Sequence, residues 1–272
     1  MTDDVAKYNI ERWAALVKAE ALFTRPWLQL NPTSARQKVD PDRRLGDIAG
    51  KDLLCLAGGG GQQSAAFALL GARVTVFDLS EAQLAKDRAA AAHYNVEIKT
   101  YQGDMRDLSS LGESAFDLVW QAYSLNFVPD ARQVFGQVGR VLRPNGLYYF
   151  MCANPFAAGL GTRDWTGNGY LLKLPYIDGA EINYADEDWV FKTGTETDPI
   201  NGPKEYRQTL SSLINGLIDH GFIILHLEEH LRPAPEAKPG SWDHLKTIAP
   251  PWLKFWVSYH PDFLEAGAST TQ

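Results

Sequence analysis

The feature that most constrains this chain is a run of four glycines at residues 58–61, directly after an apolar run at residues 53–57. The apolar run has no alternation with polar residues, which is typical of a β-strand buried on both faces of a parallel sheet. Glycine has no Cβ and adopts positive φ angles, so such a loop lets the backbone approach a ligand closely. Open α/β sheets bind ligands where their strands end. We therefore expect a strand, a ligand-binding loop and a helix over residues 62–70.

Segments of strand and helix character alternate along the rest of the chain. Strands are predicted at residues 53–57, 73–77, 96–101, 116–120 and 147–153, and helices at 5–23, 80–93, 130–142 and 206–218. Residues 31–49 are predicted as a loop, and residues 144–146 as a turn that ends a helix. Two final strands, at 222–230 and 252–260, have no helix between them and should pair antiparallel. The fold class is therefore α/β: a Rossmann-like, doubly wound, seven-stranded, mostly parallel sheet with the last strand pair antiparallel.

The composition, 45% hydrophobic and 22% charged, is that of a globular protein. No apolar stretch reaches the roughly 20 residues of a membrane-spanning helix, and the first residues lack the apolar core of a secretory signal. A net charge of −7 argues against a nucleic acid partner, because phosphate binding requires a basic surface. Cys55 and Cys152 are predicted to be buried free thiols. We therefore expect a cytoplasmic protein with a small-molecule partner, without membrane or nucleic acid contacts, and of undetermined oligomeric state.

Asp78 ends the second predicted strand, 19 residues after Gly59. An acid at that position accepts hydrogen bonds from the two ribose hydroxyls of an adenosine, although a helix cap is the alternative role. The glycines do not form a dinucleotide fingerprint, because Gln63 or Ser64 stands where the third glycine is required. They do not form a P-loop either, because no lysine follows. The sequence favours an adenosine with a small tail that is not a phosphate.

Several motifs follow one another in an order that resembles a known family. The first is a small-x-Gly-x-Gly loop on Ala57, Gly59 and Gly61, and the second is an acid that ends the second strand, Asp78, beside Leu79. A Gly-Asp-apolar triplet follows at Gly103, Asp104 and Met105. The last two are a post-strand segment at residues 121–127 and a helix-turn-strand at 140–147. This layout resembles the class I S-adenosylmethionine-dependent methyltransferases, in the small-molecule group that includes the ubiquinone and menaquinone C-methyltransferases. The resemblance covers residues 47–154 and, in outline, residues 205–260.

The resemblance implies S-adenosyl-L-methionine as the cofactor. It also implies a set of cofactor-binding residues: Ala57, Gly58, Gly59, Gly61, Gln63, Asp78, Leu79, Gln83, Asp104, Met105, Gln121 and Tyr123. In the family's manner, the Asp104 carboxylate would accept from the adenine amino group, and the Met105 backbone N–H would face a ring nitrogen. Relatives often have an acid at the position of Cys55, and here Gln62 and Gln63 are the candidates to supply polar contacts instead.

Four parts are predicted along the chain: an N-terminal helical cap (1–46), the cofactor-binding core (47–154), a β-rich insertion acting as substrate lid (155–203) and the C-terminal part of the core (204–272). The lid is expected to line an apolar pocket with Trp165, Tyr170, Tyr176, Tyr184, Trp189 and Phe191. Its acids, Asp178, Glu181 and residues 186–188, either favour an amine or form a solvated face.

The function that follows is in-line transfer of a methyl group to a small organic molecule. Tyr123 and Asn126 lie where the methyl group should emerge, and no catalytic base is identified. Tyr8 and Trp13 could cap the pocket, but packing in the core is the favoured role for both. Two alternatives stay open: a non-catalytic protein that binds the cofactor and, less favoured, an NAD(P)-dependent oxidoreductase. No metal is expected. The pattern H-x-x-E-H at residues 226–230 is rejected as a metal site, because on a strand its histidines stand roughly 13 Å apart.

Overall fold

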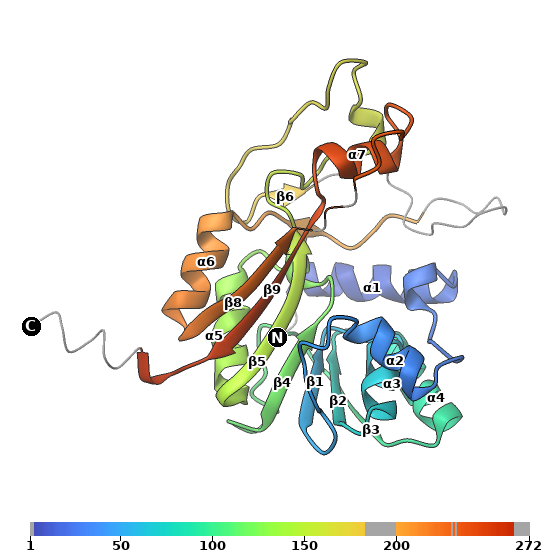
Figure 1. Ribbon diagram of the computed structural model, residues 1–272, viewed down its shortest axis with the longest axis vertical. Helices are drawn as coiled ribbons and strands as arrows, with labels where there is room; N and C mark the ends of the chain where they lie inside the picture. The colour runs from blue at the N-terminus through green and yellow to red at the C-terminus, as the bar shows by residue number, and fades with distance from the viewer. Residues whose placement is uncertain (1–2, 183–199, 230, 232, 264–272) are drawn as a thin grey trace, which may run out of the picture.

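A seven-stranded sheet forms the centre of the molecule (Figure 1). The computed structural model describes residues 3–182, 200–229, 231 and 233–263. The strands lie in the order β3-β2-β1-β4-β5-β9-β8, and their bounds are β1 Asp52–Leu56, β2 Arg73–Asp78, β3 Ile98–Gln102, β4 Phe116–Gln121, β5 Leu142–Ala153, β8 Phe222–Glu229 and β9 Trp252–Tyr259. Neighbouring strands pair in parallel except at β9, which runs antiparallel to both β5 and β8. The predicted fold class is confirmed.

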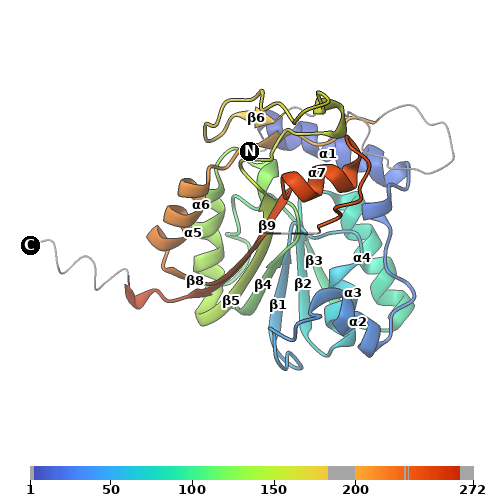
Figure 2. The same ribbon diagram turned by 45° about the horizontal axis from the view of Figure 1, so that its top comes forward.

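Helices cover both faces of the sheet. Figure 2 shows α5 and α6 on one side and α2, α3 and α4 on the other; their bounds are α2 Pro32–Val39, α3 Gln63–Leu69, α4 Glu81–Tyr94, α5 Ala131–Val141 and α6 Leu210–Asp219. Within the described ranges, no helix combines the length and the hydropathy needed to cross a membrane.

The core has two parts, one on each face of the sheet. Along β1, Leu54 and Leu56 belong to the cluster that packs under α5 and α6, whereas Leu53 and Cys55 belong to the cluster under α2 and α3. Successive side chains of a strand point to opposite faces, so burial on both faces requires an unbroken apolar run. Cys55 and Cys152 are both buried and free, as predicted.

Several elements lie across the carboxyl ends of the parallel strands (Figures 1 and 2). They are α1 (Asp4–Lys18), the short helix η1 (Leu22–Thr24), α7 (Trp242–Ile248) and the two-stranded sheet of β6 (Glu181–Ile182) with β7 (Glu205–Tyr206). The side chain of Asp3 begins α1 by accepting a hydrogen bond from the Ala6 N–H at 2.9 Å. Elements from distant parts of the sequence thus lie together at this edge of the sheet.

The segment predicted as a loop at residues 31–49 contains helix α2. Asn31 and Ser34 form a reciprocal capping box, and Pro32 occupies the first turn, where its fixed φ and missing N–H suit a helix. These local signals were present in the sequence, but the nearby charges of Arg36 and Lys38 obscured them. Both lie in the last turn, where cations are favoured by the helix dipole.

Other boundaries also differ from the prediction. The helix predicted at residues 5–23 ends at Lys18, and the separate short helix η1 follows at Leu22–Thr24. The connection between the last two strands contains a short helix, α7, which begins behind Ser241. Residues 205–206 form a strand, and α6 begins only at Leu210, after the cap Thr209. Strand β5 follows α5 directly, and residues 144–146 bulge from its start, where the pairing with β4 shifts register and Asn145 has φ +65°.

Candidate functional site

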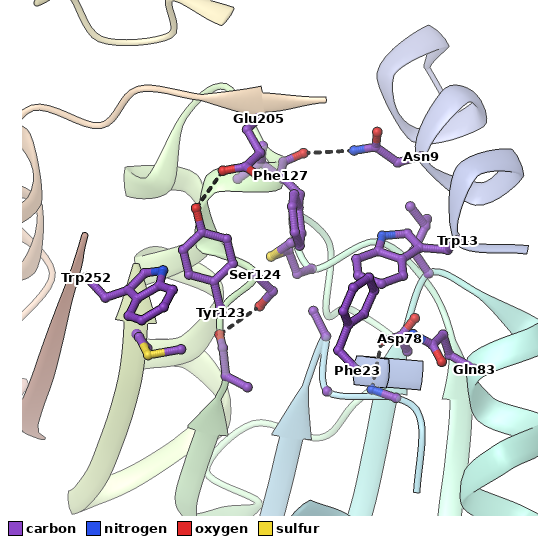
Figure 3. A pocket seen from close by; sticks show the side chains of 18 of the residues that line it. Asn9, Trp13, Phe23, Asp78, Gln83, Tyr123, Ser124, Phe127, Glu205 and Trp252 are labelled. Carbon is purple, nitrogen blue, oxygen red and sulfur yellow. Dashed lines mark hydrogen bonds between the residues drawn. The ribbon is translucent and has the colours of Figure 1, made fainter. Parts of the chain in front are cut away.

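A cavity of about 760 Å³ opens at the carboxyl ends of β1, β2 and β4 (Figure 3). Its volume lies within the range of roughly 300–1,000 Å³ that is usual for small-molecule sites. The glycine loop and the end of β2 form one side, and α1, the segment 157–162, β7 and α7 contribute to the others. The lining is largely apolar, so the few polar side chains determine how a ligand is oriented.

The glycine loop approaches the end of β2 so closely that a side chain is excluded at Gly59. A Cβ there would lie 2.6 Å from Gln83 Cβ and 3.0 Å from Asp78 Oδ2. The Gly59 N–H donates a hydrogen bond to Asp78 Oδ2 at 2.9 Å. The preceding residue, Ala57, turns the chain with φ +45°. This close approach leaves the backbone, rather than a side chain, facing the cavity.

Asp78 and Gln83 present acceptor oxygens side by side (Figure 3). Asp78 is buried, and its second oxygen, Oδ1, accepts from the Ser80 N–H at 2.8 Å. Burial raises the pKa of the Asp78 carboxyl to about 6, although the hydrogen bonds from Ser80 and Gly59 lower it. Among the described residues, no hydrogen-bond donor reaches Gln83 Oε1. Asp78 therefore accepts a hydrogen bond at the start of α4, as the alternative cap role implies, and it also lines the cavity wall.

Asp87, which the sequence analysis did not identify, holds the glycine loop from below. Its Oδ2 accepts from the Gly60 N–H at 2.9 Å, and its Oδ1 accepts from the Gly61 N–H at 3.0 Å and from the Ser64 hydroxyl. Burial raises the pKa of the Asp87 carboxyl to about 7. A signal did exist: Asp87 is three residues from both Leu84 and Ala90, on the buried face of α4, where a carboxylate requires partners.

The loop therefore receives a carboxylate from α4, although Cys55 offers none from β1. Of the two glutamines expected to compensate, Gln62 donates from Nε2 to the carbonyls of Phe23 and Arg25, at 3.1 and 2.8 Å. This ties the loop to the segment after α1. Gln63 lines the cavity.

Asp104 lines the cavity within a chain of ion pairs that reaches α1. Arg106 donates from Nε to Asp104 Oδ1 at 3.0 Å and from Nη1 to Asp3 Oδ2 at 2.6 Å. The Arg106 guanidinium holds the pKa of Asp3 down at about 2. The predicted contact of Asp104 with an adenine amino group stays a prediction, and the structure adds that this carboxylate is shared with Arg106.

Ten of the twelve predicted residues line the cavity: Ala57, Gly58, Gly59, Gln63, Asp78, Leu79, Gln83, Asp104, Met105 and Tyr123. Gly61 instead faces α4, where a Cβ would lie 2.7 Å from the Lys86 carbonyl oxygen. Gln121 is fully buried outside the lining, and it donates from Nε2 to Met105 Sδ at 3.2 Å and to Ser124 Oγ at 3.0 Å. Gly61 and Gln121 therefore contact residues next to the cavity wall without lining the cavity themselves.

The opposite end of the cavity contains a tyrosine and a glutamate that point toward each other (Figure 3). Tyr123 follows β4, and its hydroxyl donates to Glu205 Oε2 at 2.5 Å. Glu205 belongs to β7 and is only 2% exposed. Asn126, expected near Tyr123, is instead buried outside the lining, where it accepts from the Ala153 N–H at 2.7 Å. Sequence reasoning had no signal for Glu205, because it lies 82 residues from Tyr123.

The insertion was expected to line the substrate pocket with six aromatic residues. This expectation is wrong for the three of them that the structure describes. Trp165 and Tyr170 pack around His244 of α7, with ring centroids 4.7 and 5.7 Å from it. Tyr176 stacks on Phe156 and borders a separate cavity of about 250 Å³. Tyr184, Trp189 and Phe191 lie outside the described residues. The aromatic walls come from other segments: Trp13, Phe23, Tyr123, Phe127, Trp242 and Trp252.

The charged residues of the insertion have structural partners. Asp178 accepts from the Thr209 N–H at 2.6 Å, and Glu181 pairs with Lys204 at 3.2 Å; residues 186–188 lie outside the described part. Of the two candidate caps on α1, Trp13 lines the cavity, whereas Tyr8 lies outside the lining and packs under Arg12 and Lys204.

The strand predicted for the histidine pattern is confirmed, since β8 includes His226. Its Nε2 lies 3.1 Å from the Arg44 guanidinium, and His230 is outside the described residues. In the ranges that the structure describes, no cluster of three or more candidate metal ligands occurs.

The sequence is similar to those of known methyltransferases. A family described as a methyltransferase domain matches residues 54–150. The uncharacterized methyltransferase YbaJ of Bacillus subtilis (strain 168) is 36% identical over 178 residues, which cover 65% of this chain and 68% of that protein. The ubiquinone biosynthesis O-methyltransferase of Pseudomonas syringae pv. tomato is 32% identical over 151 residues, covering 54% of this chain and 65% of that protein. The chain thus spans about two thirds of these relatives.

Solved structures share the fold. An S-adenosylmethionine-dependent methyltransferase from Mesorhizobium loti superimposes with a TM-score of 0.61 at 24% identity, covering 82% of this chain and 97% of that one. The geranyl diphosphate C-methyltransferase of Streptomyces coelicolor A3(2), solved with S-adenosyl-L-homocysteine, gives a TM-score of 0.52 at 15% identity, covering 84% and 79%. At these identities the likeness concerns the arrangement of helices and strands.

Proposed function

Because the chain belongs to the class I S-adenosylmethionine-dependent methyltransferases, we propose that it methylates a small, largely apolar organic molecule held in the cavity described above. The observation that carries this proposal is the division of that one cavity. Asp78 and Gln83 lie at one end, and Tyr123, Glu205 and Trp252 lie at the other (Figure 3). One end suits the polar cofactor and the other an apolar acceptor.

The cofactor end fits S-adenosyl-L-methionine on two observations. Gly59, where a Cβ would overlap Gln83, lets the loop backbone approach Asp78, and the buried Gln83 Oε1 has no donor within the described residues. A ribose carries two neighbouring hydroxyls, and Asp78 with Gln83 supplies acceptors for them. We propose that nine of the ten lining residues of the predicted set hold the cofactor, that the tenth, Tyr123, lies toward the acceptor, and that Gly61 and Gln121 shape the wall.

When bound, the cofactor supplies a methyl group on a sulfonium sulfur that is already activated for displacement. The chain's own contribution is alignment and the exclusion of water, since the acceptor must lie about 3 Å from the methyl carbon and in line with its bond to sulfur. Trp13 of α1 and Trp252 of β9 wall the cavity from opposite chain ends. We propose that these aromatic walls hold the acceptor and keep water out.

The acceptor end favours an apolar molecule with one polar group. Its walls include Phe127 and Trp252 (Figure 3), and the cavity lining as a whole is largely apolar. A relative named for O-methylation in ubiquinone biosynthesis supports a small organic acceptor. The four-part division of the chain stays a prediction, and the 155–203 insertion fits a lid insofar as residues 157–162 line the cavity. Membership of an enzyme family disfavours the non-catalytic binder, and the family's S-adenosyl-L-methionine cofactor disfavours an NAD(P)-dependent oxidoreductase.

Calorimetric titration with S-adenosyl-L-methionine and, separately, S-adenosyl-L-homocysteine tests the cofactor end. We expect both to bind with micromolar dissociation constants, equivalent to about −8 kcal/mol. Transfer of radiolabelled methyl groups to a panel of phenols, amines and quinones then tests the acceptor end. Folded protein that gives no heat with either cofactor form at millimolar concentration would refute the proposal.

Gly59→Ala tests the close approach of the loop. The added Cβ would overlap Gln83 and crowd the Asp78 carboxylate, so we expect affinity for S-adenosyl-L-homocysteine to fall by about tenfold or more. Gly112→Ala is the control, because Gly112 lies outside the cavity lining and its Cβ would meet only Ala115 Cβ, at an ordinary 3.6 Å. Equal losses in both variants would show that the loss does not arise from this overlap.

A further inference from the structure

Helix α1 forms a wall of the cavity and buries few of its own side chains. Four of these side chains line the cavity: Val5, Ala6, Asn9 and Trp13. Only Ala6, Asn9 and Leu16 of its 15 residues are buried. A segment with few buried apolar contacts gains little free energy from packing, and such segments open locally at low cost. The position of α1 over the cavity therefore depends strongly on its polar contacts.

Polar contacts hold α1 at its middle and at its start. In the middle, Asn9 donates from Nδ2 to the Phe127 carbonyl oxygen at 3.3 Å (Figure 3), and its Oδ1 accepts from the Lys204 N–H at 2.8 Å. At the start, Arg106 donates from Nη1 to Asp3 Oδ2 at 2.6 Å and from Nη2 to Asp3 Oδ1 at 3.1 Å. Two parallel hydrogen bonds fix the orientation of such a pair as well as its position. Because Asp3 is also the N-cap of α1, this ion pair joins the start of the helix to the loop after β3.

The guanidinium that holds Asp3 also holds Asp104. Arg106 Nε lies 3.0 Å from Asp104 Oδ1 and 3.1 Å from Oδ2, and the Arg106 backbone N–H donates to Oδ1 at 2.9 Å. The Arg106 side chain is 17% exposed, so salt screens these pairs less than it screens pairs on the open surface. Asp104 lines the cavity. One cation thus connects a carboxylate proposed to bind the cofactor with the first turn of α1.

The position of α1 places it over the cofactor end of the cavity. Figure 3 shows Trp13 of α1 on the same side of the cavity as Asp78 and Gln83, and all three belong to the lining. A segment that covers a site has to open before a bound ligand exchanges, and in many enzymes this opening sets the rate of release. Each contact that breaks when α1 opens therefore slows the exchange.

We propose that the ion pair of Asp3 with Arg106 holds α1 over the bound cofactor and limits the rate at which S-adenosyl-L-homocysteine is exchanged for S-adenosyl-L-methionine; this inference rests on the proposed function. Asp3 acts through α1, and Arg106 acts through Asp3 and Asp104, so both are positioning residues. Breaking the ion pair raises the open fraction of α1, and an open site both releases and admits the ligand faster. The dissociation and association rates therefore rise together, and the equilibrium affinity changes less than either rate.

Asp3→Asn is the variant that isolates the ion pair. Asparagine caps a helix as well as aspartate does, so α1 keeps its start while the ionic contact with Arg106 is lost. The Asp3 side chain is 49% exposed, so we expect a modest effect: dissociation of S-adenosyl-L-homocysteine, followed by stopped-flow tryptophan fluorescence, should accelerate by about two- to fivefold. Hydrogen–deuterium exchange of the α1 amides in the ligand-saturated protein should accelerate by the same factor.

Asp4→Asn is the matched control, since it removes the same charge from the first turn of the same helix. The Asp4 side chain is fully exposed, pairs with Lys7 at 3.3 Å and lies outside the cavity lining, so both rates should equal those of wild type. Arg106→Lys is a second variant, because lysine keeps the positive charge but lacks the forked geometry that holds two carboxylates at once. Its dissociation and exchange rates should rise at least as much as those of Asp3→Asn.

The inference is overturned if Asp3→Asn releases the ligand at the wild-type rate, if its α1 amides exchange no faster than those of wild type, or if Asp4→Asn accelerates release as much. A lower affinity at an unchanged dissociation rate also overturns it, because Asp3 would then act on the binding site and not on the opening of α1. Failure of wild-type protein to bind S-adenosyl-L-homocysteine is a different outcome, because it contradicts the proposed function itself.

Discussion

Asp78→Ala should lower the affinity for S-adenosyl-L-homocysteine by at least about tenfold. The substitution removes the carboxylate proposed to accept from the ribose hydroxyls, and a hydrogen bond to a charged acceptor is worth about 1.5–3 kcal/mol. It also releases the Gly59 N–H, which donates to Asp78 Oδ2 at 2.9 Å. Calorimetric titration of wild type and variant at the same pH measures the change.

Asp52→Asn is the control for this measurement. Asp52 begins β1 at the opposite end of the sheet, where it pairs with Arg73 at 2.7 Å and with Arg143 at 2.9 Å. Its substitution lowers stability without reaching the cavity, so cofactor affinity should remain at the wild-type value. Unaltered affinity in Asp78→Ala would refute the assignment of this carboxylate to the ribose.

Asp87→Ala should lower the free energy of unfolding by about 3 kcal/mol and also weaken cofactor binding. The variant leaves three donors without their acceptor: the Gly60 and Gly61 N–H groups and the Ser64 hydroxyl. Each buried donor that loses its partner costs about 1–3 kcal/mol, and the costs are not fully additive. Urea denaturation gives the stability change, and titration of the folded variant gives the affinity.

Asp87→Asn is the milder comparison, because the amide keeps one acceptor oxygen but places an NH₂ group near one of the loop donors. It should therefore lose less stability than Asp87→Ala. A variant Asp87→Ala as stable as wild type, with unaltered cofactor affinity, would show that the loop is held by its own backbone and not by this side chain.

The same pair gives a pH dependence with a defined sign. The folded-state pKa of Asp87 is raised from 3.8 to about 7, so the folded protein binds this proton more tightly than the unfolded chain does. The resulting stability is fully present below about pH 4 and is lost as pH rises through about 7. Relative to Asp87→Asn, wild type should lose unfolding free energy over this interval, by at most about 1.4 kcal/mol per pH unit. A difference that grows in the opposite direction would contradict the raised pKa.

The fold was predictable because its signals are local. Unbroken apolar runs such as residues 53–57 arise wherever a strand is buried on both faces, and the glycine run marks the turn that follows. Helix α2 and helix α7 were missed although Asn31 and Ser241 are ordinary capping residues. Short helices carry little hydrophobic periodicity. Capping residues alone were therefore too weak a signal to predict a helix in segments that are polar and contain proline.

The cavity lining around the glycine loop was largely predictable for the same reason. Asp78, Leu79 and Met105 follow directly after strand ends or in short loops, and the parallel topology brings those ends to one edge of the sheet. Of the two exceptions, Gly61 faces α4, and Gln121 is the last residue of β4, with its side chain in the core, where it bonds to Ser124. Adjacent positions on a strand face opposite sides, and sequence did not reveal which side was the cavity.

By itself the sequence determined the α/β class, the strand that carries the glycine loop and the acid that ends the next strand, since each depends on residues close together in the chain. Only the tertiary structure decided what surrounds them. Asp87 reaches the loop from 26 and 27 residues away, and Glu205 meets Tyr123 across 82 residues. Such contacts depend on how α4 and β7 pack against the sheet, and packing is set by the whole core at once rather than by any local pattern.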